Sequence, residues 1–172
     1  TRQDPDVFCP ELVRLCAEAG VAVVFVRELP RIRTSGVTRW LTSTKGLIQL
    51  SLRYKTNDQL WFTFFHEAGH LILHGKRQVF FEEGTKATKV RDAEQEANEF
   101  ASDHLIPPDD WQRLKAMVKR SGYKLDPIEH FAKEIGIAPG IVVGRLQRDG
   151  LLPRSHGNHL KVSYRWPSDS ES

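Results

Sequence analysis

The sequence has no long apolar run and very few cysteines. Its 172 residues nowhere approach the ~18 consecutive apolar residues that a membrane-spanning helix requires, so we expect no membrane insertion. The two cysteines, Cys9 and Cys16, are seven residues apart. If both lie on one helix, a rise of ~1.5 Å per residue separates them by roughly 10 Å, which is too far for a disulfide. The sequence therefore argues against a disulfide-stabilised secreted domain.

A strong excess of charge and a secretory signal are also missing. The formal net charge is +3 and the isoelectric point is about 8.9, whereas nucleic-acid-binding proteins usually concentrate basic residues in one patch. The first residues, TRQDPDVFCPELVRL, have no basic segment followed by an apolar stretch and a cleavage site. We therefore predict a cytoplasmic protein, and we do not expect this chain alone to bind nucleic acid directly.

The apolar pattern of the N-terminal third predicts a helix followed by a small sheet. The hydrophobic fraction of 40% and the length of 172 residues are typical of one globular domain. Pro10 is expected to open an amphipathic helix that Gly20 ends. Three apolar runs follow at 21–26, 37–42 and 47–54, and the segment STKG joins the last two as a hairpin. We expect a sheet of about three strands.

The rest of the chain is predicted to be helical. Thr56 starts a capping-box pattern, so a helix is expected to run from there to Gly75, and its nearly continuous apolar surface predicts that it is buried. A polar segment at 76–90 predicts a loop, and a second helix is expected to begin near Asp92 and to end before Pro107. Further helical patterns cover 109–121, 127–136 and 139–150. The predicted fold class is α+β, with a small three-stranded sheet on a helical body and a helical C-terminal segment.

The segment FTFFHEAGHLILHG, residues 62–75, places two histidines and a glutamate, His66, Glu67 and His70, in the middle of an apolar run. Residues four apart lie on one face of a helix about 5–6 Å from each other, so His66 and His70 can bind the same metal ion. Glu67 flanks that position and can reach a water molecule there. The alternative is that the three side chains only pair with their neighbours. This H-E-x-x-H pattern is typical of zinc peptidases, and seven histidines in the whole chain make it a rare coincidence.

A catalytic zinc site has three protein ligands and one open position, so a third ligand must come from elsewhere. Glu94 lies on the small-residue face of the second predicted helix and is the expected third ligand. Asn98 follows one turn later, where it can hydrogen-bond a ligand. Glu96 and Glu99 fall towards the opposite side and are predicted to be surface charges. His74 lies too far along the helix axis from the first histidine to share one ion.

Two segments together resemble a known family. LIQLSLRYKTNDQLWFTFFHEAGHLILHG and EQEANEFASDHLIPP are similar to the ImmA/IrrE metallopeptidases, well over 47–108 and loosely over 10–150. The resemblance implies a compact α/β zincin fold in which one Zn2+ ion is bound by His66, His70 and Glu94, with Glu67 as the general base. It further implies a cytoplasmic regulatory peptidase that cuts a helix-turn-helix transcriptional repressor under stress or during induction of a mobile element.

The resemblance also gives an expected organisation of the chain. Residues 1–125 are predicted to form a zincin-like metallopeptidase core. Residues 126–152 are predicted to form a helical, helix-turn-helix-like segment that packs on this core. Residues 153–172 form a C-terminal extension whose end is expected to be disordered. The second helix of the helix-turn-helix-like segment is mostly apolar, so direct DNA contact is not predicted for it.

Several points have more than one interpretation at the level of sequence. Zincins commonly hold a substrate against a sheet edge, and LIQLSLR, just before the H-E-x-x-H helix, is the expected edge strand. Tyr54, Tyr123 and His104 are all candidates for stabilising the oxyanion. A site of two histidines and one carboxylate also suits ferrous iron. The rival hypothesis is a non-proteolytic metal-binding regulator, antitoxin-like or DNA-associated, in which the metal only stabilises the fold.

Overall fold

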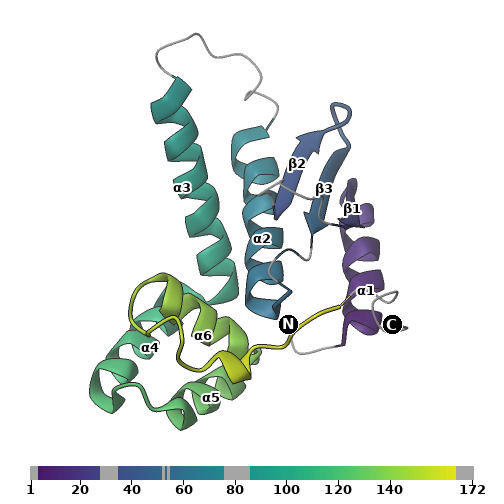
Figure 1. Cartoon of the computed structure of the whole chain (residues 1–172). Helices are drawn as coiled ribbons and strands as arrows, with labels where there is room; N and C mark the ends of the chain where they lie inside the picture. The colour runs from purple at the N-terminus through teal and green to yellow at the C-terminus, as the bar shows by residue number, and fades with distance from the viewer. Residues whose placement is uncertain (1–3, 28–34, 52, 54, 76–85, 166–172) are drawn as a thin grey trace.

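The computed structural model describes residues 4–27, 35–51, 53, 55–75 and 86–165. Over these residues the chain forms six α-helices and a three-stranded sheet, which confirms the predicted α+β class. α2 lies between α3 and the sheet, and α4, α5 and α6 gather at one end of the molecule (Figure 1). The elements are α1 (Pro5–Glu18), β1 (Val21–Val26), β2 (Gly36–Trp40), β3 (Gly46–Ser51), α2 (Asn57–Gly69), a π-helical turn η1 (His70–His74), α3 (Lys86–Leu105), α4 (Pro108–Ser121), α5 (Leu125–Glu134), α6 (Pro139–Arg148) and a 3-10 turn η3 (Asn158–Leu160).

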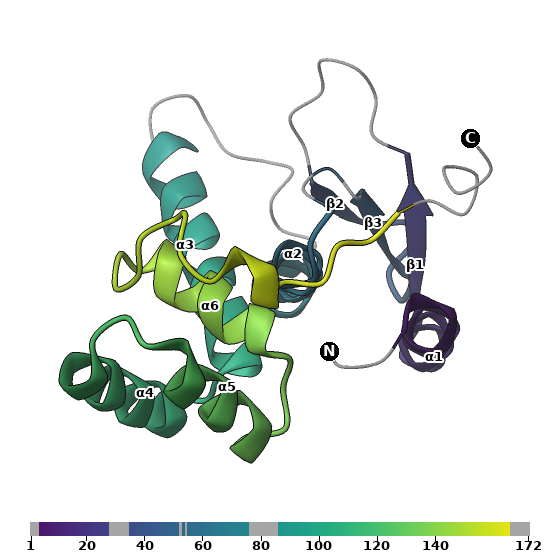
Figure 2. The same ribbon diagram turned by 60° about the horizontal axis from the view of Figure 1, so that its bottom comes forward.

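The central strand of the sheet is β3. It pairs in parallel with β1, where Val21 lies opposite Gly46, and antiparallel with β2, where Gly36 lies opposite Leu50. The expectation that LIQLSLR forms an exposed edge is therefore wrong, because β3 is hydrogen-bonded on both sides. β2 is an outer strand, and no described strand pairs with its other edge. Figure 2 shows α1 beside β1, at the opposite end of the sheet from α3.

The helix ends depart from the predicted caps. α1 begins at Pro5, and Asp4 caps it by accepting a hydrogen bond from the backbone N–H of Asp6 at 3.0 Å. Pro10 therefore lies inside the helix and does not open it. Thr56 is the N-cap residue of α2, but its side chain makes no capping hydrogen bond. The backbone N–H of Asn57 instead donates to the carbonyl of Val162 at 2.9 Å, so the C-terminal segment holds this end of the helix.

The long helix predicted from Thr56 to Gly75 is present, but its last turn is a π-helix. This turn is not buried as predicted, because Ile72 and Leu73 are 67% and 48% exposed. The second helix begins at Lys86, six residues earlier than expected, and ends at Leu105 as predicted. Most of the predicted 76–90 loop, residues 76–85, lies outside the described residues, while the rest of it is helical.

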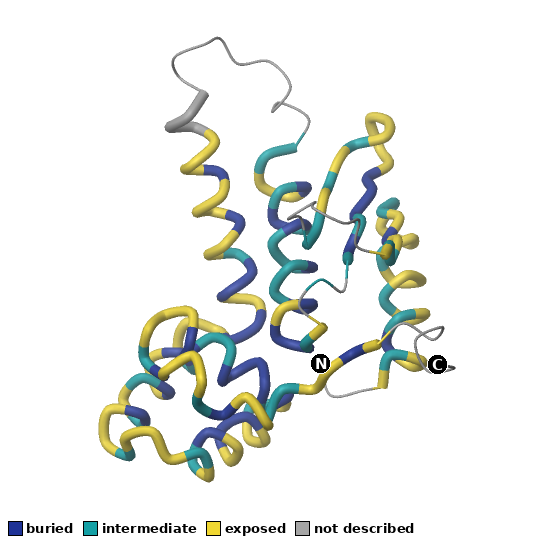
Figure 3. Tube along the Cα trace, viewed as in Figure 1, coloured by how far each residue is buried: buried dark blue, intermediate teal, exposed yellow. Residues whose placement is uncertain are grey.

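The core is continuous from the sheet to α6. Buried residues line the facing sides of α2 and α3 and extend into the three C-terminal helices (Figure 3). Four apolar residues of α6 are at most 2% exposed, namely Ile141, Val142, Val143 and Leu146. Tyr164 packs on Phe8 with ring centroids 5.6 Å apart, so residues beyond α6 also join the core. The predicted disordered tail, 166–172, lies outside the described residues. Within the described part of the chain, no helix is long and apolar enough to cross a membrane.

Candidate metal centre

Close contact between α2 and α3 brings the predicted ligands together. Ala97 and Ala101 of α3 are completely buried against α2. A Cβ atom at Gly69 would lie 3.2 Å from the Cα of Ala97, so the two backbones approach nearly as closely as they can. As predicted, small residues thus allow α3 to place Glu94 beside the histidines of α2 and η1. His66, His70 and Glu94 each offer one ligand atom, and these atoms all lie within 4.8 Å of one another.

The spacing of these three atoms fits one small metal ion. The Nε2 atoms of His66 and His70 are 3.1 Å apart. Glu94 approaches them with one carboxylate oxygen each, at 3.4 Å from His66 and 3.2 Å from His70. Tetrahedral bonds of ~2.0–2.1 Å place ligand atoms about 3.3 Å from one another. The residues present therefore match the size and the donor types of a zinc site with two histidines and one carboxylate.

Hydrogen bonds to the other ring nitrogens orient both histidines. Nδ1 of His66 lies 3.0 Å from Oδ1 of Asn98, which can only accept, so this ring donates from Nδ1. Nε2 of His74 lies 2.9 Å from Glu96, and Nδ1 of His74 lies 3.1 Å from Nδ1 of His70. When neutral His74 donates to Glu96, its Nδ1 accepts from His70. In both ligands, Nε2 is then free of its proton and faces the metal position.

Glu67 is largely buried next to this position. Its side chain is 7% exposed, and burial, followed by the charge of Glu94, raises its pKa to about 7. Burial also lowers the pKa of His70, and the neighbouring His66 lowers it further, which favours the neutral imidazole that a metal requires. β2 approaches Glu67 closely, because a Cβ atom at Gly36 would lie 2.7 Å from its side chain.

An open cleft of about 590 Å³ contains all the predicted site residues. It is lined by His66, Glu67, His70, Glu94 and Asn98. The rest of the cleft wall comes from the start of α2 and from the outer strand of the sheet, at Ser35, Gly36, Val37, Thr38, Gln59, Phe62 and Thr63. The cleft therefore joins the proposed ligand triangle, a buried carboxyl group and the outer strand β2, whose other edge pairs with no described strand.

Some residues have contacts or positions that the sequence did not indicate. The side chain of Glu96 is 60% exposed, as expected for a surface charge, and it also contacts His74, which the sequence did not predict. Glu94 is 52% exposed, so it reaches the site from the rim of the cleft. His104 stacks on Phe100, and its ring is not part of the cleft wall. Tyr123 packs near His156 and is likewise absent from that wall.

Tyr54, the third candidate for stabilising the oxyanion, lies outside the described residues. Glu99 accepts a hydrogen bond from Gln95 on the exposed side of α3, as expected for a surface charge. Among the described residues, the cleft contains no tyrosine or arginine that could bind an oxyanion.

A peptidase-family model described as the IrrE N-terminal-like domain matches residues 16–147. The comparison with curated proteins finds no match. A solved structure described as a Mycobacterium tuberculosis transcriptional regulator is 19% identical, with a TM-score of 0.46, and the alignment covers 87% of this chain and 44% of that chain. The chain thus spans less than half of that protein, and a likeness of this size carries no functional argument.

Proposed function

The chain belongs to the peptidase family of the IrrE N-terminal-like domain, and on this premise we propose that it is a zinc-dependent endopeptidase. The observation that supports the proposal best is the triangle of His66, His70 and Glu94 beside the buried carboxyl group of Glu67. Structural zinc sites are normally closed by four protein ligands, whereas this triangle opens into a cleft. An open position is what a hydrolytic site requires.

The role of each residue follows from its surroundings. Zinc bound at this site would polarise the scissile carbonyl group and acidify a water molecule. Glu67 takes the proton of the attacking water on its carboxylate and gives it to the leaving amine. In the metal-free protein, burial and the charge of Glu94 raise the pKa of Glu67 to about 7. Asn98 and His74 keep the two histidine rings in the tautomers described above.

The substrate is proposed to bind along β2. An extended peptide can add to an open sheet edge through backbone hydrogen bonds, and β2 forms one wall of the cleft. Val37, which is 46% exposed, offers an apolar contact for a substrate side chain. This assignment replaces LIQLSLR, whose strand lies in the middle of the sheet.

The natural substrate is proposed to be a protein, namely a helix-turn-helix transcriptional repressor. Support comes from the family motif in this sequence, since the resemblance to the ImmA/IrrE metallopeptidases implies a cytoplasmic, stress- or mobile-element-linked switch. Cutting such a repressor would release transcription without requiring this chain to contact DNA. The helix-turn-helix-like segment of this chain is consistent with a role outside DNA binding. The apolar side chains of its second helix, α6, are buried in the core.

The decisive experiment compares three forms of the full chain after reconstitution with zinc. Helix-turn-helix repressors encoded near its gene serve as substrates, and fragments are identified by mass spectrometry. The parent protein and Glu99→Gln, which makes the same chemical change on the exposed side of α3, should cleave. Glu67→Gln should bind zinc stoichiometrically and cut at least about 1000-fold more slowly, because the proton acceptor is lost.

Cleavage by Glu67→Gln at the parental rate would remove Glu67 as the base. A biological response that persists in this variant without any cleavage would favour the non-proteolytic regulator. Metal analysis of the protein isolated from its host decides between zinc and ferrous iron at the same ligands.

A further inference from the structure

A second cavity, here called the basic pocket, lies on the other side of α2 from β2. Its volume is about 740 Å³, and it is enclosed by α2, the end of α3, α6 and the segment after α6. Four cationic side chains line it, namely Arg145, Arg148, Arg154 and Lys161. Asp58 is the only acidic residue among its described lining residues. A formal excess of three positive charges therefore surrounds this cavity.

The basic pocket adjoins the cleft of the metal centre. Gln59 and Phe62 line both cavities, so the two are separated by little more than these side chains of α2. The guanidinium group of Arg148 lies over the ring of Phe62 at 3.9 Å. The same Phe62 ring lies near the metal centre, because its centroid is 6.1 Å from that of the His66 ring. A ligand longer than the cleft can continue past Phe62 into the pocket.

Lys161 is paired with Asp58 at 2.7 Å, whereas Arg145 and Arg148 share the single carboxylate of Asp149, which leaves part of their positive charge uncompensated. Arg148 donates to the hydroxyl of Ser102 at 2.6 Å and meets Asp149 only at 3.5 Å. Burial, and next the positive charge of Arg145, lower the pKa of Arg148, while Asp149 raises it. Arg145 is paired with Asp149 at 2.9 Å and also donates to the carbonyl of Ser102 at 3.0 Å. Arg154 forms no ion pair with any residue that the structure describes.

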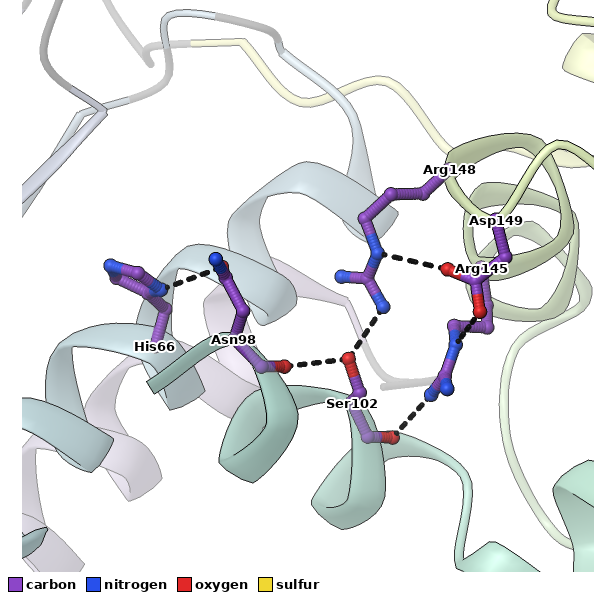
Figure 4. Close-up of polar contacts among 6 residues, drawn as sticks. All are labelled: His66, Asn98, Ser102, Arg145, Arg148 and Asp149. Carbon is purple, nitrogen blue, oxygen red and sulfur yellow. Dashed lines mark hydrogen bonds and ion pairs between the residues drawn. The ribbon is translucent and has the colours of Figure 1, made fainter. Parts of the chain in front are cut away.

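A chain of polar contacts fixes the distance between the two sites. His66 contacts the side chain of Asn98, Ser102 donates to the carbonyl of Asn98 at 2.6 Å, and Arg148 donates to Ser102 (Figure 4). Asn98 and Ser102 lie on successive turns of α3, the helix that also carries Glu94. The basic pocket is thus positioned relative to the metal centre by one rigid helix.

From these contacts we infer that the basic pocket is an exosite that binds carboxylate groups of an acidic segment in the protein substrate. The segment lies next to the residues that occupy the cleft. The inference rests on the proposed peptidase function and adds a recognition element to it. Charge complementarity favours an anionic ligand, and the shared wall at Phe62 favours a polypeptide that also fills the cleft. A nucleic acid is disfavoured, because the inner face of α6 is buried and cannot enter a groove.

Binding can be measured separately from cleavage. The probes are short, extended, rhodamine-labelled peptides that carry a run of glutamates, glutamines or lysines at one end or the other. The zinc-loaded full chain with Glu67→Gln prevents turnover, and fluorescence anisotropy at low and raised salt gives the dissociation constants. A glutamate peptide should bind at least about 10-fold more tightly than its glutamine counterpart at low salt, and this advantage should shrink as salt is added.

Variants locate the contact. Arg154→Gln removes a cation that makes no described ion pair, and it should weaken the glutamate peptide about 3- to 5-fold without affecting the glutamine peptide. Arg120→Gln makes the same change on the exposed surface of α4, outside the pocket, and should have no effect. Arg154→Glu should reduce the preference for glutamate over lysine peptides. Circular dichroism confirms that each variant is folded.

The outcomes separate this inference from the peptidase proposal. Equal binding of glutamate and glutamine peptides, or equal effects of Arg154→Gln and Arg120→Gln, would overturn the exosite even if the parent protein cleaves repressors. Salt-dependent, Arg154-dependent binding would support it even if no tested peptide is cut. Tighter binding of a single-stranded oligonucleotide of similar length, with the same dependence on Arg154, would overturn it in favour of a nucleic-acid site.

Discussion

The carboxyl group of Glu67 shows how position on a helix can decide the chemistry of a residue. It lies one residue from His66, so it is turned out of the ligand triangle and under β2, where it is 7% exposed. The H-E-x-x-H spacing predicts this arrangement, because helix geometry alone separates the three side chains. The surroundings that raise its pKa to about 7 were not predictable, since Gly36 and Glu94 reach it from distant parts of the sequence.

This raised pKa makes the stability of the metal-free protein depend on pH. A folded-state pKa near 7, above the usual value of 4.5, means that ionisation of Glu67 costs stability progressively as the pH rises from about 4.5 to 7. Glu67→Gln removes this cost. In the presence of a chelator, the variant should gain up to about 3 kcal/mol over the parent at pH 8, and much less at pH 5. Urea unfolding at both pH values measures the difference; the same gain at pH 5 and pH 8 would contradict it.

The contact between Glu96 and His74 should affect metal affinity although neither residue is a proposed ligand. Loss of the carboxylate frees His74 to change its tautomer, so His70 is oriented less well. Glu96→Gln should lower zinc affinity about 10-fold. Competition with a zinc-binding dye measures this constant, and Glu99→Gln on the same helix provides the matched control. Equal affinities of the two variants would show that His70 needs no support from this side.

At the scale of elements, the sequence predicted most helices and strands but not how they are arranged. Helix periodicity and turn residues indicate each element because those signals are local. They did not predict that β3 lies between β1 and β2, because strand order depends on pairing between residues far apart in the chain. The π-helical turn after Gly69 and the early start of α3 were missed for a similar reason, since packing between helices overrides local preference.

Gly36 is predicted to be required for activity and not for metal binding. A Cβ atom at this position would lie 2.5 Å from Thr63 and 2.7 Å from Glu67, so the added methyl group must push one of them away. Gly36→Ala should lower kcat/KM on a cleaved repressor by about 10- to 100-fold, because Glu67 is displaced by a fraction of an ångström or more. Zinc affinity of the same variant is the internal control and should stay close to that of the parent. Full activity would show that β2 can move without cost.

At the scale of the whole molecule, the two ends of the described chain are packed together. The segment after α6 accepts a hydrogen bond from the backbone N–H of Asn57, and its Tyr164 packs on Phe8 of α1. Lys161 of this segment pairs with Asp58 at 2.7 Å, and Asp58 is 5% exposed. The sequence pattern correctly indicated helices near residues 128–150. The contact between residues 58 and 161 was not predicted, because a pairing of residues so far apart in the chain leaves no periodic pattern in the sequence.

The pair of Lys161 and Asp58 should contribute to global stability. Lys161→Met leaves a buried carboxylate without its partner and should lower the free energy of unfolding by about 3 kcal/mol. Adding Asp58→Asn removes the buried charge and should restore most of the loss. Urea unfolding of the parent, the single variant and the double variant forms the test. A double variant as unstable as the single one would assign the effect to lost packing of the Lys161 side chain.

Phe62 has one ring face towards Arg148 and lies near His66, so a single side chain borders both cavities. Equilibrium linkage imposes a condition on any two ligands that share such a wall. If filling the basic pocket changes the affinity for zinc by some factor, then zinc must change the affinity of the pocket for its ligand by the same factor. Where this factor favours binding, a substrate that occupies both sites helps to retain the ion that cuts it, and product release weakens the binding of both.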